Sequence, residues 1–255
     1  MENVIQSKID SGELSLLHFS SLERDKQKEI AEYISSTSEG DGNLLEVHYK
    51  ELSSRACFLV LLDEKNKFIS CAGLMQPEAN AFGMMMSEVG TMITVPEWRG
   101  KGCATYLLHQ IDEWAANSNA VDGIYAFISE KSRDLVISSG YRAEVNYLGK
   151  RLNVADILPK TATDLCRTVC GHRDKIRLMD LSEKDSLSEA ENAELLAGKF
   201  AREKKFEKEI VALEQKIAVE KDSEKIRTYE EVIWAYVQNL RNNLYCCDFA
   251  VAKLL

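Results

Sequence analysis

The chain has 255 residues, of which 45% are hydrophobic, and its formal net charge is −9 at pH 7. This length and hydrophobic content suffice for one large or two small domains with a buried core. No apolar run approaches the roughly 20 residues of a membrane span, and residues 1–15 lack the features of a secretory signal, so we expect a cytoplasmic protein. The acidic balance disfavours nucleic acid as a partner.

The first part of the chain alternates strand-like and helix-like segments, which indicates a sheet covered by helices. The strand-like segments are residues 13–18, 56–62, 68–74, 84–95, 123–128 and 141–153. The helix-like segments are 21–35, with Ser20 or Ser21 as N-cap, 44–52, 105–116 and 130–139. The polar turn at 63–67 joins two apolar runs and predicts an antiparallel hairpin.

The composition changes near Pro159 to segments rich in Glu, Lys, Ala and Leu. Apolar residues at helical spacing predict helices over about 190–219 and 224–243, the first with a capping box that begins at Ser188. The two helices either fold back as an antiparallel hairpin or pair as a coiled coil with another subunit; one long helix is the alternative. Residues 244–254 alternate as a strand does and predict a return to the sheet.

These patterns predict two domains. An α+β domain occupies residues 1–155, and an all-helical C-terminal region, with its possible final strand, occupies residues 156–255.

The most informative segment runs from Val95 to Ala104 and reads Val-Pro-Glu-Trp-Arg-Gly-Lys-Gly-Cys-Ala. It joins the strand at 84–95 to the helix at 105–116. Small residues at such a junction leave backbone N–H groups bare at the start of a helix, where phosphate oxygens bind. We therefore expect a cofactor that carries phosphate.

Within that segment, the pattern Arg99-x-x-Gly102-x-Ala104 resembles the acyl-CoA pyrophosphate motif of the GNAT superfamily of N-acetyltransferases. A Gly140-Tyr141 pair stands about forty residues downstream, where the family usually has Gly-Phe. The resemblance covers about residues 12–153. It implies the GNAT fold, a mixed, largely antiparallel twisted sheet flanked by helices, and it implies acetyl-CoA as co-substrate.

The resemblance also implies which residues bind that co-substrate. The backbone at the strand end would hold the pantetheine arm as a neighbouring strand is held. Backbone N–H groups of the turn and helix start would hold the diphosphate. The implied cofactor-binding residues are Met92, Ile93, Thr94, Arg99, Gly100, Lys101, Gly102, Cys103, Ala104, Thr105 and Ser129.

Glu88 is the candidate general base, because some protein-acetylating members of the family carry a glutamate at this position. It lies in an otherwise apolar strand, where burial raises the pKa of a carboxyl group. The alternative is that Glu88 has no catalytic function and is a carboxylate at a strand edge that faces solvent or pairs with a lysine.

Two positions depart from the family pattern. Val136 stands where many members carry a tyrosine that protonates the coenzyme thiolate, and valine has no proton to donate. Ser129 stands where an asparagine is frequent.

The seven cysteines are odd in number and mostly lie in apolar runs, which is typical of reduced thiols. Cys166, Cys170 and His172 invite a zinc interpretation, but this spacing fits an apolar helix stripe equally well, and we predict no metal site.

The sequence therefore predicts an N-acetyltransferase that moves the acetyl group of acetyl-CoA to a primary amine by direct attack. The acceptor is a small molecule or a protein, and the C-terminal helices are candidates for a homodimer contact. The alternative is a catalytically weak acyl-CoA-binding module whose helical half mediates dimerisation or partner binding.

Overall fold

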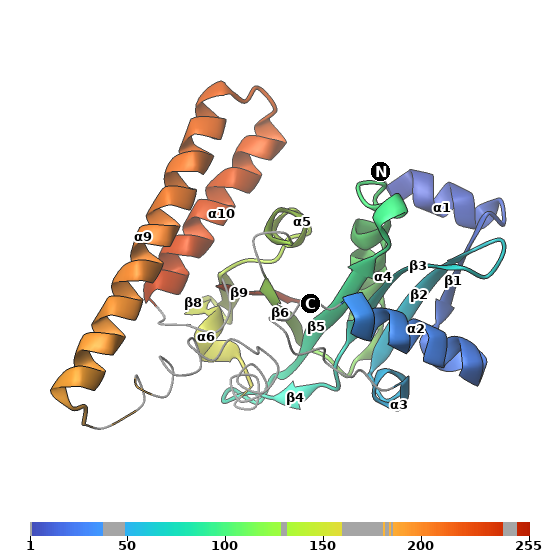
Figure 1. Cartoon of the computed structure of the whole chain (residues 1–255), viewed down its shortest axis with the longest axis horizontal. Coiled ribbons are helices and arrows are strands. Elements are labelled where there is room, and N and C mark those ends of the chain that lie inside the picture. Colours follow the sequence, from blue (N-terminus) through green and yellow to red (C-terminus); the bar gives the residue numbers. More distant parts are fainter. Residues whose placement is uncertain are drawn as a thin grey trace. The chain divides into compact units, whose positions relative to one another are not determined.

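The computed structural model of the chain describes residues 2–37, 49–128, 132–159, 181, 184, 186–241 and 249–255 (Figure 1). The chain forms two compact units. The first comprises residues 1–126 with 254–255, and the second comprises residues 127–253.

The first unit is built on a twisted sheet. Its strands are β1 (Leu14–His18), β2 (Cys57–Asp63), β3 (Phe68–Leu74), β4 (Glu78–Ala79), β5 (Met85–Thr94) and β6 (Gly123–Ile128). The order is β1-β2-β3-β5-β6, and β4 pairs with β5. All of these pairs are antiparallel except β5 with β6, which is parallel. The mixed, largely antiparallel sheet is thus confirmed.

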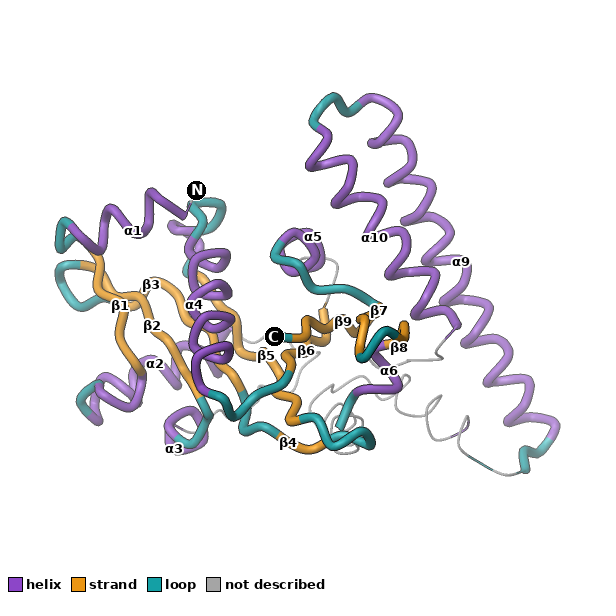
Figure 2. The backbone as a smooth tube through the Cα atoms, turned by 180° about the vertical axis from the view of Figure 1, so that it is seen from behind, coloured by secondary structure: helices purple, strands orange, loops and turns teal. Residues whose placement is uncertain are grey.

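Helices cover both faces of this sheet (Figure 2). They are α1 (Glu2–Asp10), α2 (Arg24–Thr37), α3 (Tyr49–Ser53) and α4 (Cys103–Ser118), with short 3-10 turns η1 (Phe19–Ser21) and η2 (Pro96–Trp98). Helix α4 packs on β2, β3 and β5, and α1 lies against α4. The hydroxyl of Tyr106 on α4 donates a hydrogen bond of 2.8 Å to Gln6 Oε1 on α1.

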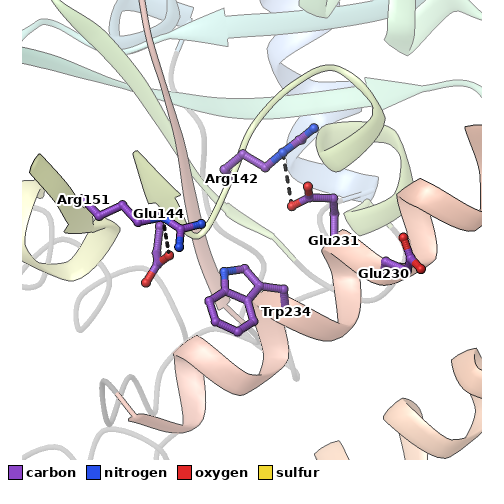
Figure 3. A pocket seen from close by; sticks show the side chains of 6 residues that line it. All are labelled: Arg142, Glu144, Arg151, Glu230, Glu231 and Trp234. Atoms are coloured by element: carbon purple, nitrogen blue, oxygen red, sulfur yellow. Dashed lines mark ion pairs between the residues drawn. The ribbon is translucent and has the colours of Figure 1, made fainter. Parts of the chain in front are cut away.

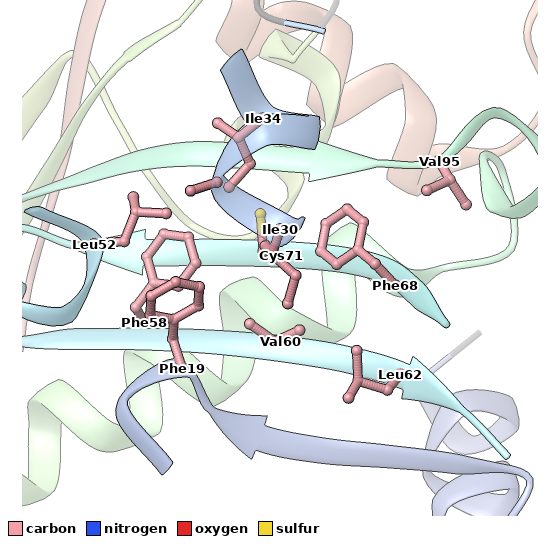
Figure 4. Packing of buried hydrophobic residues seen from close by; sticks show 11 residues of the cluster. Phe19, Ile30, Ile34, Leu52, Phe58, Val60, Leu62, Phe68, Cys71 and Val95 are labelled. Atoms are coloured by element: carbon pink, nitrogen blue, oxygen red, sulfur yellow. The ribbon is translucent and has the colours of Figure 1, made fainter. Parts of the chain in front are cut away.

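The opposite face of the sheet carries a hydrophobic core beneath α2 (Figure 4). Its fully or nearly buried members are Phe19, Ile30, Ala31, Ile34, Leu52, Phe58, Val60, Leu62, Phe68, Cys71 and Val95. The rings of Phe19 and Phe58 meet edge to face with centroids 5.2 Å apart. Alternate residues of β2 point into this core, because successive side chains of a strand face opposite sides of the sheet.

Several expected elements differ at their ends. Helix α2 begins at Arg24, and Ser21 belongs to the preceding 3-10 turn, where its hydroxyl donates to the carbonyl of His18 instead of capping the helix. Helix α1 was not expected from the sequence. The predicted segment 44–52 is described only from residue 49, where α3 begins.

The second unit contains short elements and a long helical pair. Its elements are α5 (Arg133–Ser138), β7 (Glu144–Tyr147), β8 (Lys150–Asn153), α6 (Val154–Ile157), α9 (Glu189–Val219), α10 (Ser223–Arg241) and β9 (Phe249–Leu254). The expectation of one strand-like tail over 141–153 was wrong. Leu148 and Gly149 both adopt positive φ, 49° and 76°, so the chain turns there and β7 and β8 form a hairpin.

The two long helices lie side by side as a hairpin, as one of the predicted alternatives has it (Figure 1). Ser188 and Glu191 form the predicted capping box at the start of α9. Phe206 on α9 and Tyr236 on α10 pack with ring centroids 4.7 Å apart. Arg133 of α5 donates to Glu209 at 3.0 Å and to the hydroxyl of Tyr236, which ties α5 to both helices.

The predicted final strand is present as β9, and residues 244–248 lie outside the described part of the chain. The backbone N–H of Leu255 donates to the carbonyl of Asp122 at 3.1 Å, within the first unit. The predicted domain boundary at residue 155 stays a prediction.

Among the described residues, no helix is long and apolar enough to cross a membrane.

Candidate functional site

The middle of β5 is irregular, and this irregularity divides the strand into two halves. Thr91 and Met92 both lie opposite the single residue Ala72 of β3, which is a β-bulge. Thr91 adopts φ 54°, a conformation that costs a β-branched residue energy. A bulge bends its strand, and here the pairing of β5 with β6 covers only Met86 to Glu88.

Beyond Glu88, β5 has an edge on which the described strands make no pair with it. The N–H of Val95 donates to the carbonyl of Ile69 at 2.9 Å, so the backbone groups of Ile93, two residues earlier, also point toward β3. The alternate residues Met92 and Thr94 therefore direct theirs to the open edge. Of the three residues expected to hold pantetheine, Met92 and Thr94 direct backbone groups to that edge, although the Thr94 carbonyl already accepts from Arg99 Nε. The backbone of Ile93 is used within the sheet.

The turn after β5 has the conformation that its glycines permit. Gly100 and Gly102 adopt φ 72° and 88°, in the left-handed region that other residues enter at a cost. No heavy atom of the protein lies within 4 Å of the position where a Cβ at residue 100 would stand, so within the chain it is the conformation that requires glycine there.

The start of α4 leaves N–H groups without acceptors in the helix. The first helical bond runs from the N–H of Tyr106 to the carbonyl of Gly102 at 2.9 Å, and Gly102 offers no side chain as a cap. The N–H groups of Cys103, Ala104 and Thr105 precede that bond. The helix dipole adds a partial positive charge at the same point, so the geometry suits a diphosphate.

Three side chains of the turn have distinct roles. Arg99 folds back, and its Nε donates to the carbonyl of Thr94 at 3.1 Å, so it joins the turn to the end of β5. Lys101 is exposed, with Nζ 4.8 Å from the centroid of the Trp98 ring. Trp98 packs against the core below α2, which agrees with a packing role.

Glu88 is the last residue of β5 that pairs with β6, and it lies opposite Tyr125. Burial raises the pKa of the Glu88 carboxyl group to about 7, while the nearby Arg55 cation and a hydrogen bond from the Tyr125 hydroxyl act to lower it. Glu88 Oε2 is buried and has no hydrogen-bond partner. A carboxyl group with a pKa near 7 suits a general base at neutral pH. The alternative of a solvent-facing, lysine-paired carboxylate does not hold.

Arg55 and Tyr125 are residues of this site that the sequence did not reveal. Arg55 precedes β2 in the chain and Tyr125 follows α4, and only the sheet brings them to Glu88. A lone basic residue beside an apolar run was the only signal for Arg55. The nearby Cys71 is not a candidate nucleophile, because burial raises the pKa of its thiol to about 12.

The remaining predicted residues fall elsewhere. Ser129, Cys166, Cys170 and His172 lie outside the described part of the chain. Among the residues that are described, no group of three or more His, Cys, Asp or Glu side chains is placed to hold a metal ion. Val136 lies in α5 with 2% of its surface exposed.

The second unit has a cavity of about 440 Å³, and Figure 3 shows its lining. Arg142 pairs with Glu231 at 3.2 Å, and Arg151 pairs with Glu144 at 3.5 Å. Trp234 forms another part of the wall, 37% exposed. Since its arginines are matched by carboxylates, we assign this cavity no chemistry.

The first unit is therefore an α+β fold with a mostly antiparallel sheet, whose bulged strand leads into a glycine turn and a helix. Residues 24–135 match the model of the acetyltransferase (GNAT) family, within the range 12–153 of the predicted resemblance. Residues 24–135 thus form a GNAT acetyltransferase domain. Such a domain is an acyltransferase, and acetyl-CoA is its co-substrate.

Solved structures of acetyltransferases are similar to this chain. An acetyltransferase from Trypanosoma brucei has 20% sequence identity and a TM-score of 0.41, and the match covers 55% of this chain and 99% of that one. A GNAT family N-acetyltransferase from Escherichia coli, in complex with CoA, has 14% identity and a TM-score of 0.42, with coverage of 51% and 69%.

A variant of spermidine N-acetyltransferase from Vibrio cholerae has 21% identity and a TM-score of 0.38, with coverage of 54% and 88%. No curated protein matches the sequence.

Proposed function

We propose that the first unit transfers the acetyl group of acetyl-CoA to a primary amine by direct attack, with Glu88 as the general base. The observation that carries this proposal is the layout of one continuous segment. A buried carboxyl group, an open strand edge and a glycine turn follow one another at Glu88, Met92 to Thr94 and Gly100 to Thr105.

The co-substrate is expected to lie along this segment. Its diphosphate accepts hydrogen bonds from the N–H groups at the start of α4, and its pantetheine amides bond to Met92 and Thr94. Lys101 adds a positive charge beside the phosphates. Ser129, which the resemblance implies, remains a further candidate.

The reaction requires the amine to be neutral when it attacks the thioester carbonyl. The Glu88 carboxylate accepts one proton from the ammonium group, and the nitrogen lone pair then forms the new C–N bond. The C–S bond breaks and the sulfur leaves as a thiolate. The nitrogen gives up its second proton, and the thiolate takes up one proton, so that the products are an amide and a free thiol. Val136 does not supply that proton, because its side chain has none to give.

Because Val136 stands in place of the usual tyrosine, we also propose a second function, that of a catalytically weak acyl-CoA-binding module. The α9–α10 hairpin offers that function a surface, because Leu196, Phe200, Val211 and Val219 are at least half exposed. In this proposal the hairpin recruits a partner or a second copy of the chain.

The test is titration with acetyl-CoA, followed by an assay of thiol release with a panel of amines. The transferase proposal expects both binding and amine-dependent release of CoA. Binding without transfer to any amine would favour the binding module. Glu64→Gln, an exposed carboxylate in the β2–β3 turn, is the control for Glu88→Gln.

A further inference from the structure

Arg55 is a buried cation without an adequate counterion. Its side chain is only 8% exposed and lies over the ring of Phe58, with 5.3 Å between Cζ and the ring centroid. Nε and Nη1 are buried and have no hydrogen-bond partner. The nearest ion-pair partner is Glu51, whose Oε1 lies 3.9 Å from Nη2 and whose side chain is 55% exposed. Leaving a guanidinium in this state costs free energy, so an anion that reaches it gains a strong interaction.

A glycine creates the place that the guanidinium occupies. Phe58, Gly73 and Gly90 are neighbours across β2, β3 and β5, on the same face of the sheet. A Cβ at Gly73 would stand 2.8 Å from Arg55 Nη1 and 2.5 Å from the Phe58 ring, so a side chain there would displace both. Gly73 is therefore needed for Arg55 to lie flat on the sheet.

The space above Gly90 is less crowded, because one carbon atom fits there at ordinary van der Waals distances. A Cβ there would have only two heavy atoms within 4 Å outside the adjacent residues, Arg55 Nη1 and Glu88 Oε1, each at 3.9 Å. The cation and the carboxyl group thus both lie near one point, less than twice that distance apart. They form no ion pair with each other, and each keeps at least one buried polar atom without a hydrogen-bond partner, Arg55 Nη1 and Glu88 Oε2.

We propose that this space receives an amine acceptor that carries a carboxylate beside its amine, and that Arg55 binds the carboxylate. This inference rests on the proposed function, in which Glu88 takes the proton of the same amine. A zwitterion such as an amino acid places its ammonium group toward Glu88 and its carboxylate toward Arg55, and so matches both charges.

Other acceptors match the space less well. An acceptor with a second amine close to the first would place a positive charge next to Arg55, which is repulsive. A dianionic phosphate would satisfy Arg55 but bring two negative charges beside Glu88. A small amino acid or related zwitterion is therefore the class that we commit to.

The first experiment uses the unaltered protein. Transfer rates are measured for matched sets of acceptors: α-amino acids, their amides and the corresponding amines without the carboxylate, compared at equal concentrations of neutral amine. A hydrogen-bonded charge pair is worth about 1.5–3 kcal/mol, so the amino acids should exceed their amides in kcat/KM by roughly 10- to 100-fold. Equal rates for amides, or faster rates for the plain amines, would overturn the inference.

The second experiment changes Arg55. In Arg55→Gln, measured at a pH well above 7 so that Glu88 is ionised, we expect KM for the amino acid to rise roughly 10-fold or more, with KM for the amide and the affinity for acetyl-CoA unchanged. Arg55→Lys should restore part of the difference. The matched control is Arg24→Gln, because Arg24 also lies over an aromatic ring, that of Tyr49 at 5.6 Å, but is exposed and should leave selectivity intact.

The outcomes separate this inference from the proposed function. Transfer to amines without preference for a carboxylate, or an equal loss for all acceptors in Arg55→Gln, would refute the inference and leave the transferase proposal standing. Acetyl-CoA binding with no transfer to any acceptor would refute both. If Arg55→Gln does not fold, the acceptor sets and calorimetric titration of amino acids into the CoA-loaded unaltered protein still decide the question.

Discussion

The two halves of β5 differ in what surrounds them, and the difference separates two tasks within ten residues. The first half is paired on both sides and ends at Glu88, whose carboxyl group is buried and has a pKa of about 7. The second half follows the bulge and pairs with β3, and on its other edge it pairs with no strand that the structure describes. Pairing and burial on one side of the bulge suit proton transfer, and an unpaired edge on the other suits binding.

The largest effect is expected from Glu88→Gln. It removes the proposed base from the first half, so kcat should fall roughly 10²-fold or more. The affinity for acetyl-CoA, which the second half and the turn provide, should not change. Thiol-release kinetics and calorimetric titration measure the two quantities. A comparable loss of affinity would mean that the two halves do not act separately.

Substitution in the glycine turn should have the converse effect. Gly100→Ala forces an alanine to adopt φ 72°, at a cost of about 1 kcal/mol, or moves the N–H groups that the phosphates need. We expect acetyl-CoA to bind roughly 10-fold more weakly, with little change in kcat at saturation.

Gly83→Ala is the matched control for that change. Gly83 adopts φ 77° and, like Gly100, has no heavy atom within 4 Å of its added Cβ. Both variants should lose similar stability in urea unfolding, but only Gly100→Ala should lose affinity. Equal affinities in the two variants would remove the turn from the cofactor site.

The pH dependence reports on the first half. Glu88 must be ionised to accept a proton, so kcat/KM should rise with pH and level off above the pKa of about 7. Arg55 lowers this pKa, so in Arg55→Gln the rise should shift to higher pH. A profile of Arg55→Gln that coincides with that of the unaltered protein would contradict the charge coupling.

The raised pKa of Glu88 also makes the free energy of unfolding depend on pH. The folded pKa of Glu88 exceeds its ordinary value of 4.5, so its contribution to stability is fully present below pH 4.5 and is lost as pH rises through 7. The loss is on the order of 3 kcal/mol. In Glu88→Gln, the free energy of unfolding measured in urea should change less between pH 4.5 and 7 than in the unaltered protein.

The smallest effect is expected at Lys101. Its ammonium group is exposed, so Lys101→Gln should weaken acetyl-CoA binding only about three- to ten-fold and reduce the dependence of affinity on salt. Titrations at low and high ionic strength measure this. An unchanged salt dependence would place the phosphates away from Lys101.

The local patterns of the sequence predicted most of the fold. Alternating apolar runs around the turn at 63–67 predicted the β2–β3 hairpin, and the capping box at Ser188 predicted the start of α9. The end of the chain as a strand was also predictable, from its period of two. The hairpin at Leu148 was missed because leucine gives no signal for positive φ.

The sequence by itself determined the glycine turn, the strand before it, the helix after it and the position of Glu88, because these depend on neighbours within about twenty residues. The tertiary structure alone decided what surrounds Glu88. Arg55 and Tyr125 meet it only when β3 pairs with both β2 and β5 and β6 runs parallel beside β5. Burial and charge at one carboxyl group depend on residues far apart in the chain, and no local pattern encodes that meeting.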